Sequence, residues 1–306
     1  MRSTTTRPTG SLLPFDLRTE EASFAPPTDP ASPRNAFTVD VEDWYQSCLD
    51  YDAPITERVV RNVDRMLSVL DQADAKASFF VQGMVAEKFP GLVSTLVAEG
   101  HEVQSHGYSH RPLFAMNRAQ LRDELERGKK TVEDAAGTAV TAFRAQDFSI
   151  RESNLWALET VADVGFKVDS SIFPMRSRHY GIGNWEVGPH YLVSDGAERL
   201  LEVPVAIWAI GRLRIPVAGG GYLRLLPWRV IERGLQGIEA KRRPAIVYCH
   251  PYEFSTDELG EYPEVARRIR LAQGIGRKAI AGRVHLLFAN FKFGRMDDVL
   301  SAWGLT

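Results

Sequence analysis

The segment His106-Gly107-Tyr108-Ser109-His110 directly follows a strand-like run, His101-Glu102-Val103-Gln104-Ser105. Two imidazoles four residues apart share one face of a helical turn, so their nitrogens can converge on a single metal ion. The same spacing is also common on polar helix faces that bind nothing. The residues in the rest of the chain therefore have to decide between a metal site and a polar surface.

A carboxylate cluster closes a second strand-like segment. Ala36-Phe37-Thr38-Val39 is followed by Asp40-Val41-Glu42-Asp43. Two imidazoles and one carboxylate, with the remaining positions open to water, are typical of a catalytic zinc-type site and not of a closed structural one. The sequence therefore predicts a bound divalent metal, with Zn²⁺ as the preferred ion.

The composition is that of an ordinary globular protein. The chain has 306 residues, 44% of them hydrophobic and 25% charged, and a formal net charge of −2. This near-neutral charge argues against nucleic acid as a partner, because phosphate binding needs a dominant basic surface. Only Cys48 and Cys249 are present. We expect two buried, reduced thiols rather than a disulfide framework.

The N-terminal segment lacks the pattern of a secretory signal. Residues 1–34 are rich in Thr, Ser and Pro and have no long apolar core. We expect a disordered leader there and one folded domain over 35–306. No stretch approaches the length of a transmembrane helix. We therefore expect an intracellular protein, located in the cytoplasm or at the inner face of a membrane.

Strand-like and helix-like segments alternate along most of the chain. Short apolar runs predict strands at 37–41, 77–81, 102–105, 142–144, 166–168 and 245–248. Three- and four-residue apolar spacing, with start and stop signals, predicts helices at 59–70, 89–99, 118–136, 153–164 and 228–238. Frequent Gly and Pro interrupt the alternation over 180–225, where we expect an irregular, β-rich insertion.

This alternation indicates an α/β fold. Strands separated by helices imply a parallel sheet with right-handed crossovers, and about seven such units predict a barrel. Active sites of such barrels gather at the carboxyl ends of the strands. Reactive side chains stand at or just past five different predicted strand ends, namely Asp40, His106, Arg144, Asp169 and His250. Their equivalent positions favour one shared active site.

His101 serves as a comparison for the two motif histidines. It begins the strand that leads to His106, and at about 3.3 Å per residue the two lie roughly 16 Å apart. We expect a surface histidine near the opposite rim of the barrel, without a role in metal binding.

Five motifs follow one another in a characteristic order. They are Thr38 to Tyr45, His106 to His110, Phe143 to Gln146, Asp169 to Pro174, and Cys249 to Pro251. This set resembles the polysaccharide deacetylases, the NodB-homology enzymes of carbohydrate esterase family 4. The closer resemblance is to a bacterial branch associated with exosortase and exopolysaccharide gene clusters. That branch shares the Asp-Val-Glu-Asp-Trp opening, a Gly-Gly-Gly-Tyr segment (here Gly219 to Tyr222) and a His-Pro-Tyr-Glu-Phe run (here His250 to Phe254).

The resemblance extends over residues 35–300 and carries expectations about fold and function. It implies a distorted (β/α)7 barrel, a divalent metal that is usually zinc, and hydrolysis of the acetyl amide of an N-acetylated sugar. The implied substrate is a bacterial exopolysaccharide or its precursor, as polymer or oligosaccharide. Association with exopolysaccharide assembly machinery is implied as well.

The resemblance also assigns roles to the strand-end residues. Asp40 matches the general base that takes a proton from water, and Arg144 matches the arginine that orients this base. His250 matches the acid that protonates the leaving amine, because an amide cannot release an amine anion. Asp169 matches the carboxylate that orients His250 by fixing its tautomer.

The metal carboxylate is left open between two residues. His106 and His110 match the two imidazole ligands. The usual pair of consecutive aspartates is replaced here by Asp40-Val41-Glu42-Asp43. Relatives with an Asp-x-Asp opening favour Glu42 as the ligand, whereas a local bulge would present Asp43. Two further departures, Gly107 for Ser or Thr and Gln146 for Pro, put rate and substrate fit in doubt.

Several other features have plainer interpretations. The glycines at 219–221 lack the context of a phosphate loop and suit a loop where backbone approaches sugar. The basic stretch over 267–283 suits a solvated helix face. The aromatic residues Trp44, Tyr45, Trp185 and Tyr222 could stack on sugar rings or pack in the core.

Two alternative functions also fit parts of the pattern. One is a metal-independent amidase or allantoinase-like hydrolase, and retention of both motif histidines speaks against it. The other is an inactive glycan-binding protein. The joint presence of Asp40, Arg144 and His250 speaks against that alternative.

Overall fold

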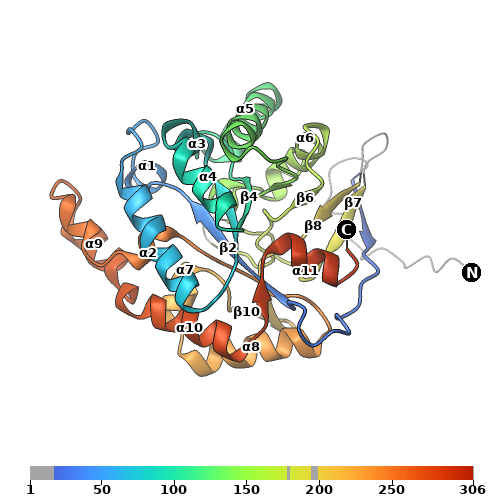
Figure 1. Cartoon of the computed structure of the whole chain (residues 1–306). Helices are drawn as coiled ribbons and strands as arrows, with labels where there is room; N and C mark the ends of the chain where they lie inside the picture. Colours follow the sequence, from blue (N-terminus) through green and yellow to red (C-terminus); the bar gives the residue numbers. More distant parts are fainter. Residues whose placement is uncertain (1–16, 178–179, 194–198, 306) are drawn as a thin grey trace, which may run out of the picture.

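Seven parallel strands form the centre of the fold. The structure is a computed structural model that describes residues 17–177, 180–193 and 199–305. The parallel strands lie in the order β8, β6, β5, β4, β3, β2 and β11, with helices around them (Figure 1). They span β2 Asn35–Val41, β3 Ser78–Val81, β4 Glu102–Ser105, β5 Ala142–Phe143, β6 Val168–Asp169, β8 Leu200–Glu202 and β11 Ile246–Cys249.

The sheet is a distorted barrel, which confirms the predicted fold class. Its outermost parallel strands are β8 and β11. Just after β8, the Ala206 N–H donates to the Ile246 carbonyl of β11 at 2.9 Å. Irregular backbone therefore joins the two sides of the barrel there. Because the strands are parallel, their carboxyl ends lie at one mouth.

The helices cover the strands on the outside. They are α1 Trp44–Cys48, α2 Arg58–Gln72, α3 Gly83–Lys88, α4 Pro90–Ala98, α5 Arg118–Ala136, α6 Ala157–Asp163, α7 Gly220–Leu225, α8 Trp228–Ala240, α9 Arg267–Gly274, α10 Ile280–Asn290 and α11 Met296–Ala302. Short 3₁₀ turns are η1 Leu113–Ala115, η2 Gln146–Phe148, η3 Glu152–Asn154, η4 Pro251–Phe254, η5 Glu258–Glu261 and η6 Arg277–Ala279. No helix in the described ranges is long and apolar enough to cross a membrane.

The predicted helix at 118–136 is confirmed at both ends, because its capping residues are local signals. The Asn117 side chain accepts from the Gln120 N–H, and the Gln120 side chain accepts from the Asn117 N–H. This capping box satisfies two donors that a helix start leaves free. At the other end Gly137 adopts φ 67°, a left-handed conformation that glycine accepts without steric cost.

Part of the expected leader is a strand, so that expectation is wrong for residues 17–34. β1 (Arg18–Glu21) pairs antiparallel with β7 (His190–Val193), and Leu17 is buried. The partner lies about 170 residues away in the sequence, which local composition does not reveal. Residues 1–16 of the expected leader lie outside the described residues.

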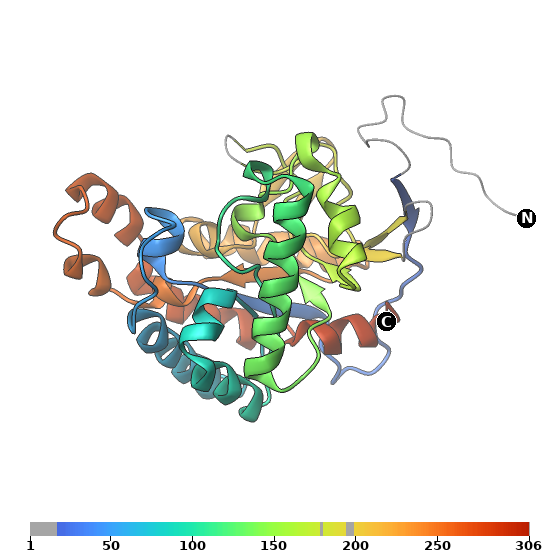
Figure 2. The same cartoon turned by 90° about the horizontal axis from the view of Figure 1, so that it is seen from above.

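The expected β-rich insertion contains both strands and a helix. β7 continues the sheet from β8, and β9 (Ile207–Ile210) pairs with β10 (Leu213–Pro216) as a separate hairpin. A short strand, β12 (Phe293–Gly294), adds to β2 near the C-terminus. Helix α7 begins inside the glycine run, where we had expected a loop. Figure 2 shows β7 and α9 projecting at opposite ends of the molecule.

Strand β2 is buried on both of its faces. Phe37, Val39 and Val41 join the main apolar cluster, whereas Thr38 and Asp40 alternate with them. Thr38 donates to the Val247 carbonyl at 2.9 Å. Alternation along a strand therefore sends every second side chain of β2 into the barrel, and the polar ones are those that form the site.

Two smaller expectations need correction. The predicted helix at 153–164 is split into η3 and α6. Cys48 is exposed, because it lies at the end of the short helix α1, whereas Cys249 on β11 is buried as expected.

His101 lies at the start of β4, as expected, but it is buried and not on the surface. It is 5% exposed, its ring contacts Phe79, and its Nδ1 accepts from the Ala77 N–H at 3.1 Å. Burial, with a contribution from the Lys76 charge, lowers the pKa of His101 to about 4. The fold therefore holds this imidazole in its neutral form.

We expect His101 to make the protein less stable in acid. Its folded pKa lies below the unfolded value of about 6.5, so protons bind the unfolded chain first. The stabilisation is complete above about pH 6.5 and is lost as the pH falls toward 4. In urea unfolding at pH 7.5 and pH 5, with a chelator present throughout, His101→Asn should lose less stability than the unmodified protein. Asparagine keeps an acceptor near the Nδ1 position, and equal losses would contradict the prediction.

Candidate metal centre and active site

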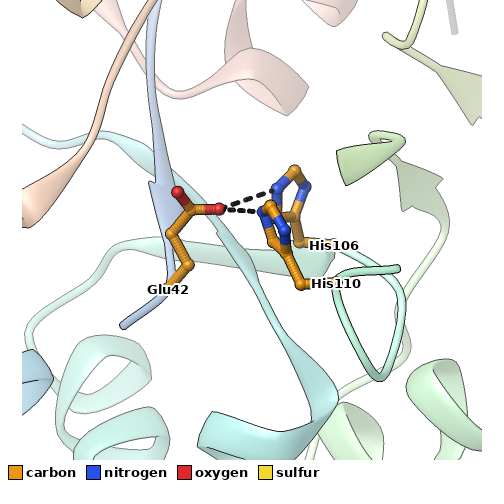
Figure 3. A group of neighbouring side chains, drawn as sticks. All are labelled: Glu42, His106 and His110. Carbon is orange, nitrogen blue, oxygen red and sulfur yellow. Dashed lines mark ion pairs between the residues drawn. The ribbon is translucent and has the colours of Figure 1, made fainter. Parts of the chain in front are cut away.

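Glu42, His106 and His110 come together at the carboxyl ends of β2 and β4 (Figure 3). One ligand atom from each residue lies within 4.8 Å of the other two, and all three side chains are buried. Glu42 Oε2 is 3.5 Å from His106 Nε2 and also forms an ion pair with His110 Nε2. The imidazoles of the motif and a carboxylate of the opening cluster therefore converge, as expected.

The two histidines do not share a helical turn, so that part of the prediction is wrong. Residues 106–110 form a loop in which Gly107 has φ 70° and His110 has φ 63°. The Glu124 carboxylate of α5 holds this loop, because it accepts from the N–H groups of Tyr108 and Ser109 at 2.8 and 2.7 Å. A distant residue thus supplies the convergence that we had attributed to local spacing.

The two departures from the family pattern are neighbours in space. A Cβ on Gly107 would lie 2.7 Å from Gln146 Oε1, so the glutamine occupies room that the glycine leaves. Gln146 Nε2 donates to the Glu124 carboxylate at 3.1 Å and to the Arg111 carbonyl at 3.0 Å. Gln146 therefore braces the loop that carries His110.

His106 is oriented by the backbone. Its Nδ1 lies 2.9 Å from the Arg144 carbonyl, which can only accept a hydrogen bond. The Nδ1 must therefore carry the proton, which leaves Nε2 free to bind a cation. The buried nitrogens of His110 have no hydrogen-bond partner among the described residues.

Asp43 belongs to a different part of the structure. Its Oδ1 accepts from the Tyr45 N–H at 3.1 Å, and its Oδ2 accepts from the N–H and hydroxyl of Thr56 at 2.8 and 2.6 Å. It is the N-cap of α1. Alternation along the strand directs Asp40 and Glu42 to one side and Asp43 away from it. Of the two candidate carboxylates, the structure brings Glu42 to the histidines.

Asp40 and Arg144 form a buried ion pair inside the barrel. Arg144 Nη1 lies 2.8 Å from Asp40 Oδ1 and 2.7 Å from the Thr38 hydroxyl. The guanidinium also donates to the carbonyl and hydroxyl of Ser170 at 3.2 and 3.0 Å. The expected contact between base and arginine is present, and the catalytic roles of the two residues stay a prediction.

Asp169 does not occupy the place that we expected. Its carboxylate accepts from the Ser171 hydroxyl at 2.5 Å and lies beside the Glu202 carboxyl. Burial raises the pKa of both acids, and that of Glu202 is raised further by the charge of Asp169. Strand β6 is only two residues long, and β8 follows it in the sheet. Asp169 pairs in register with Glu202 of β8, so its side chain faces Glu202 rather than His250.

The carboxylate beside the His250 ring is Glu253. His250 Nδ1 lies 3.5 Å from Glu253 Oε2, and His250 Nε2 lies 3.9 Å from Glu42 Oε1. One ring nitrogen therefore faces the Glu253 carboxylate and the other faces the cluster of Glu42, His106 and His110. The His250 side chain is 19% exposed, so a substrate can approach it.

The charges at the site favour a bound cation. Burial raises the pKa of Glu42, but His110 and its neighbours hold it well below the usual value. Burial lowers the pKa of His110, and the Glu42 charge raises it to about 9. A buried carboxylate that stays ionised requires nearby positive charge. Two imidazole nitrogens and one carboxylate oxygen are ligands that suit zinc, so the residues present fit a divalent metal.

Two plainer expectations are settled by burial. Trp44 is fully buried with Tyr252, Leu259 and Tyr262, so it packs in the core. Arg277 is buried as well and donates to the Tyr252 carbonyl at 2.6 Å. The solvated-face interpretation of the basic stretch therefore fails for Arg277, although α9 itself has no buried residue.

Sequence reasoning missed two residues that shape the site, Glu124 and Glu253. Glu124 is one of many acidic residues on a polar helix, and nothing local marks it. Glu253 stands three residues after His250 in a run that we had noted only as a shared motif. That spacing, in a turn that begins with proline, is the signal that could have identified it.

Two family models match the chain in succession. The model described as "Polysaccharide deacetylase" matches residues 48–166, and "Domain of unknown function (DUF3473)" matches residues 170–301. The first segment includes His106, His110 and Arg144. The second includes His250, and the opening carboxylates precede both segments.

Curated relatives are similar over part of their length. A peptidoglycan-N-acetylglucosamine deacetylase of Bacillus cereus is 35% identical over 96 residues, which are 31% of this chain and 35% of that protein. A chitooligosaccharide deacetylase of Bradyrhizobium sp. is 26% identical over 141 residues, which are 46% of this chain and 57% of that protein. The chain thus spans between a third and three fifths of these relatives.

Two solved structures share the fold over nearly the whole chain. A Mycobacterium smegmatis structure described as a "putative polysaccharide deacetylase" has a TM-score of 0.60 at 22% identity, covering 94% of this chain and 95% of that one. The Puue allantoinase has a TM-score of 0.59 at 15% identity, covering 92% and 94%. Membership in the exosortase-associated branch stays a prediction. As the ordered motifs predicted, this chain carries a polysaccharide deacetylase (NodB-homology) domain over residues 48–166.

Proposed function

We propose that this protein is a metal-dependent hydrolase that removes N-acetyl groups from amino sugars of a glycan. The observation that carries the proposal is the convergence of Glu42, His106 and His110 beside the Asp40–Arg144 pair and His250. This arrangement provides three ligands, a base and an acid at one barrel mouth. Deacetylase names among the relatives support the same reaction.

Each side chain has a distinct part in the hydrolysis. Glu42, His106 and His110 would hold a divalent cation, which when bound would supply a Lewis acid to polarise the acetyl carbonyl and acidify water. Asp40 accepts a proton from the attacking water, and its ion pair with Arg144 holds the carboxylate in place. His250 Nε2 gives a proton to the amide nitrogen as the C–N bond breaks. The products are acetate and a free amine on the sugar.

His250 is suited to act as this acid. Burial lowers its pKa, but the Glu253 hydrogen bond and the charges of Glu42, Glu253 and Asp40 raise it to about 9. These acidic neighbours therefore favour the protonated ring. An amide needs such an acid because its amine leaves poorly as an anion.

The finer proposal concerns the substrate and the place of action. We expect an exopolysaccharide or its precursor, reached from the cytoplasmic side, together with association with the assembly machinery. Support comes from the motifs of the exosortase-associated branch and from aromatic residues near the site. Tyr248 contacts the His250 ring at 5.8 Å between centroids, and the Tyr222 and Tyr180 hydroxyls are 3.3 Å apart.

The metal prediction distinguishes the two candidate carboxylates. His106→Ala, His110→Ala and Glu42→Gln should each lose bound zinc, measured by elemental analysis of folded protein. Asp43→Asn is the matched control and should keep its metal, because Asp43 caps α1. Its unfolding free energy should change little, because Asn caps a helix about as well as Asp and only the bonds from Thr56 are altered. Full metal in Glu42→Gln together with loss in Asp43→Asn would reverse the assignment.

Asp40→Asn should keep the metal and the fold but lose turnover by roughly 10²- to 10⁴-fold, the usual contribution of a general base. Steady-state kinetics on an N-acetylated chitooligosaccharide provides the measurement. Asp169→Asn is a matched control, since it removes a buried strand-end carboxylate that contacts Ser171. It should cost less turnover than Asp40→Asn. Near-normal deacetylation by Asp40→Asn would show that another residue is the base.

Acetate release should be confined to glycans. The zinc-loaded protein should act on oligomers of N-acetylglucosamine or a related amino sugar, and not on acetylated peptides or allantoin. Activity only on allantoin would favour the allantoinase-like alternative, and persistence of activity after chelation would rule out metal dependence. No hydrolysis, with tight glycan binding, would favour the glycan-binding alternative. Cell fractionation tests the location, and recovery only outside the cytoplasm would contradict it.

A further inference from the structure

The Glu253 carboxylate lies on the side of the His250 ring that faces away from the metal ligands. Glu253 Oε2 is 3.5 Å from His250 Nδ1 and accepts from the His250 N–H at 3.1 Å. The buried Nδ1 has no hydrogen-bond partner in the described part of the chain, and Glu253 is the carboxylate that lies beside it. Both contacts join residues three apart in η4, so the carboxylate and the ring belong to one turn.

Arg224 fixes this carboxylate from the opposite side. Its Nε donates to Glu253 Oε1 at 2.9 Å, and the two side chains are 9% and 2% exposed. Its Nη1 donates to the Gln273 and Ile275 carbonyls at 2.9 and 2.6 Å. The guanidinium is thus held at both ends. A buried ion pair of this kind has little freedom to reorient.

The glycine run makes room for the pair. A Cβ on Gly220 would overlap the Glu253 carboxylate, and a Cβ on Gly219 would overlap the Tyr248 ring. Gly220 and Arg224 are four residues apart on α7, so they present the same face. The shared Gly-Gly-Gly-Tyr segment therefore approaches Glu253 and Tyr248, where we had expected it to approach sugar.

We propose that Arg224 and Glu253 form a fixed relay that positions His250, with Nδ1–H held by Glu253 and Nε2 directed at the leaving nitrogen. The inference rests on the proposed deacetylation. A carboxylate at Nδ1 fixes the tautomer and ring orientation of a histidine. Glu253 thereby takes the part that the family resemblance gave to Asp169. The two segments around 219–224 and 250–254 thus position His250 together.

The substitution Glu253→Gln tests the relay because glutamine has only one acceptor oxygen where glutamate has two. Arg224 and the His250 ring face different oxygens of Glu253, so the one amide oxygen of glutamine can replace only one of them. With the oxygen on Arg224, the amide N–H₂ faces Nδ1 and favours the opposite tautomer. The variant keeps the size of the side chain, so packing should change little.

The measurement compares two substrates with different leaving groups. An N-acetylated chitooligosaccharide releases an amine that needs a proton, whereas an aryl acetate releases a phenolate that leaves unaided. We expect Glu253→Gln to lower kcat on the amide by roughly 10- to 100-fold, as loss of an orienting partner does. KM, zinc content and aryl acetate hydrolysis should change little. His250→Ala provides the reference. It should also lower amide hydrolysis selectively over aryl acetate hydrolysis, and its loss of kcat on the amide should be larger.

Two further variants separate positioning from folding. Gly220→Ala displaces the carboxylate without changing any charge and should show the same selective loss. Glu258→Gln is the matched control, because Glu258 is a buried carboxylate paired with Arg277 at 3.6 Å, outside the relay. It should leave the ratio of amide to aryl acetate activity unchanged. A structural role for Glu253 would instead lower both activities together.

The outcomes distinguish the inference from the proposed function. If the native protein is active and His250→Ala is selective, an unchanged ratio in Glu253→Gln and Gly220→Ala overturns the relay alone. If the native protein releases no acetate from any glycan, the proposed function fails. In that case the ¹⁵N shifts of the His250 ring still test the relay. At a pH above the pKa of the ring, where it is neutral, protonated Nδ1 in the native protein, shifted to protonated Nε2 in Glu253→Gln, supports the relay, and identical spectra overturn it.

Discussion

The buried guanidinium of Arg144 holds the two halves of the active site together. Its side chain pairs with Asp40 and Thr38 on β2 and with Ser170 just after β6. Its backbone carbonyl accepts from His106 Nδ1. A buried charge costs several kcal/mol unless it is paired, so these partners stabilise the guanidinium inside the barrel. Arg144 therefore fixes the proposed base Asp40, the proposed metal ligand His106 and the spacing between them.

Polar contacts from residues outside the site offset the energy of strained backbone at the site. His110, Asp147 and Phe148 all have positive φ, a conformation that costs energy in residues other than glycine. The Glu124 carboxylate binds the loop that contains His110 through two N–H groups and the Ser109 hydroxyl. Gln146 adds a hydrogen bond to the same carboxylate. The departures at Gly107 and Gln146 thus form one compact arrangement that leaves the proposed catalytic groups in place.

The active site is assembled from three stretches of the chain. The deacetylase-matched segment, 48–166, supplies the histidine ligands and Arg144. The opening strand before it supplies Asp40 and Glu42. The DUF3473 segment, 170–301, supplies His250 together with Glu253 and Arg224. We therefore propose that this segment completes the proton-donating side of the barrel mouth.

The sequence by itself determined the alternation of strands and helices, the barrel and the set of strand-end residues. Periodicity, caps and strand ends are local signals, and parallel strands place their carboxyl ends together whatever their order. Only the tertiary structure decided which groups touch. Glu42 rather than Asp43 meets the histidines because strand alternation and the α1 cap separate the two. Glu253 rather than Asp169 meets His250, and β1 meets β7, because these contacts depend on how distant segments pack. Packing across the barrel leaves no periodic trace in a single sequence, and this is the physical reason for the limit.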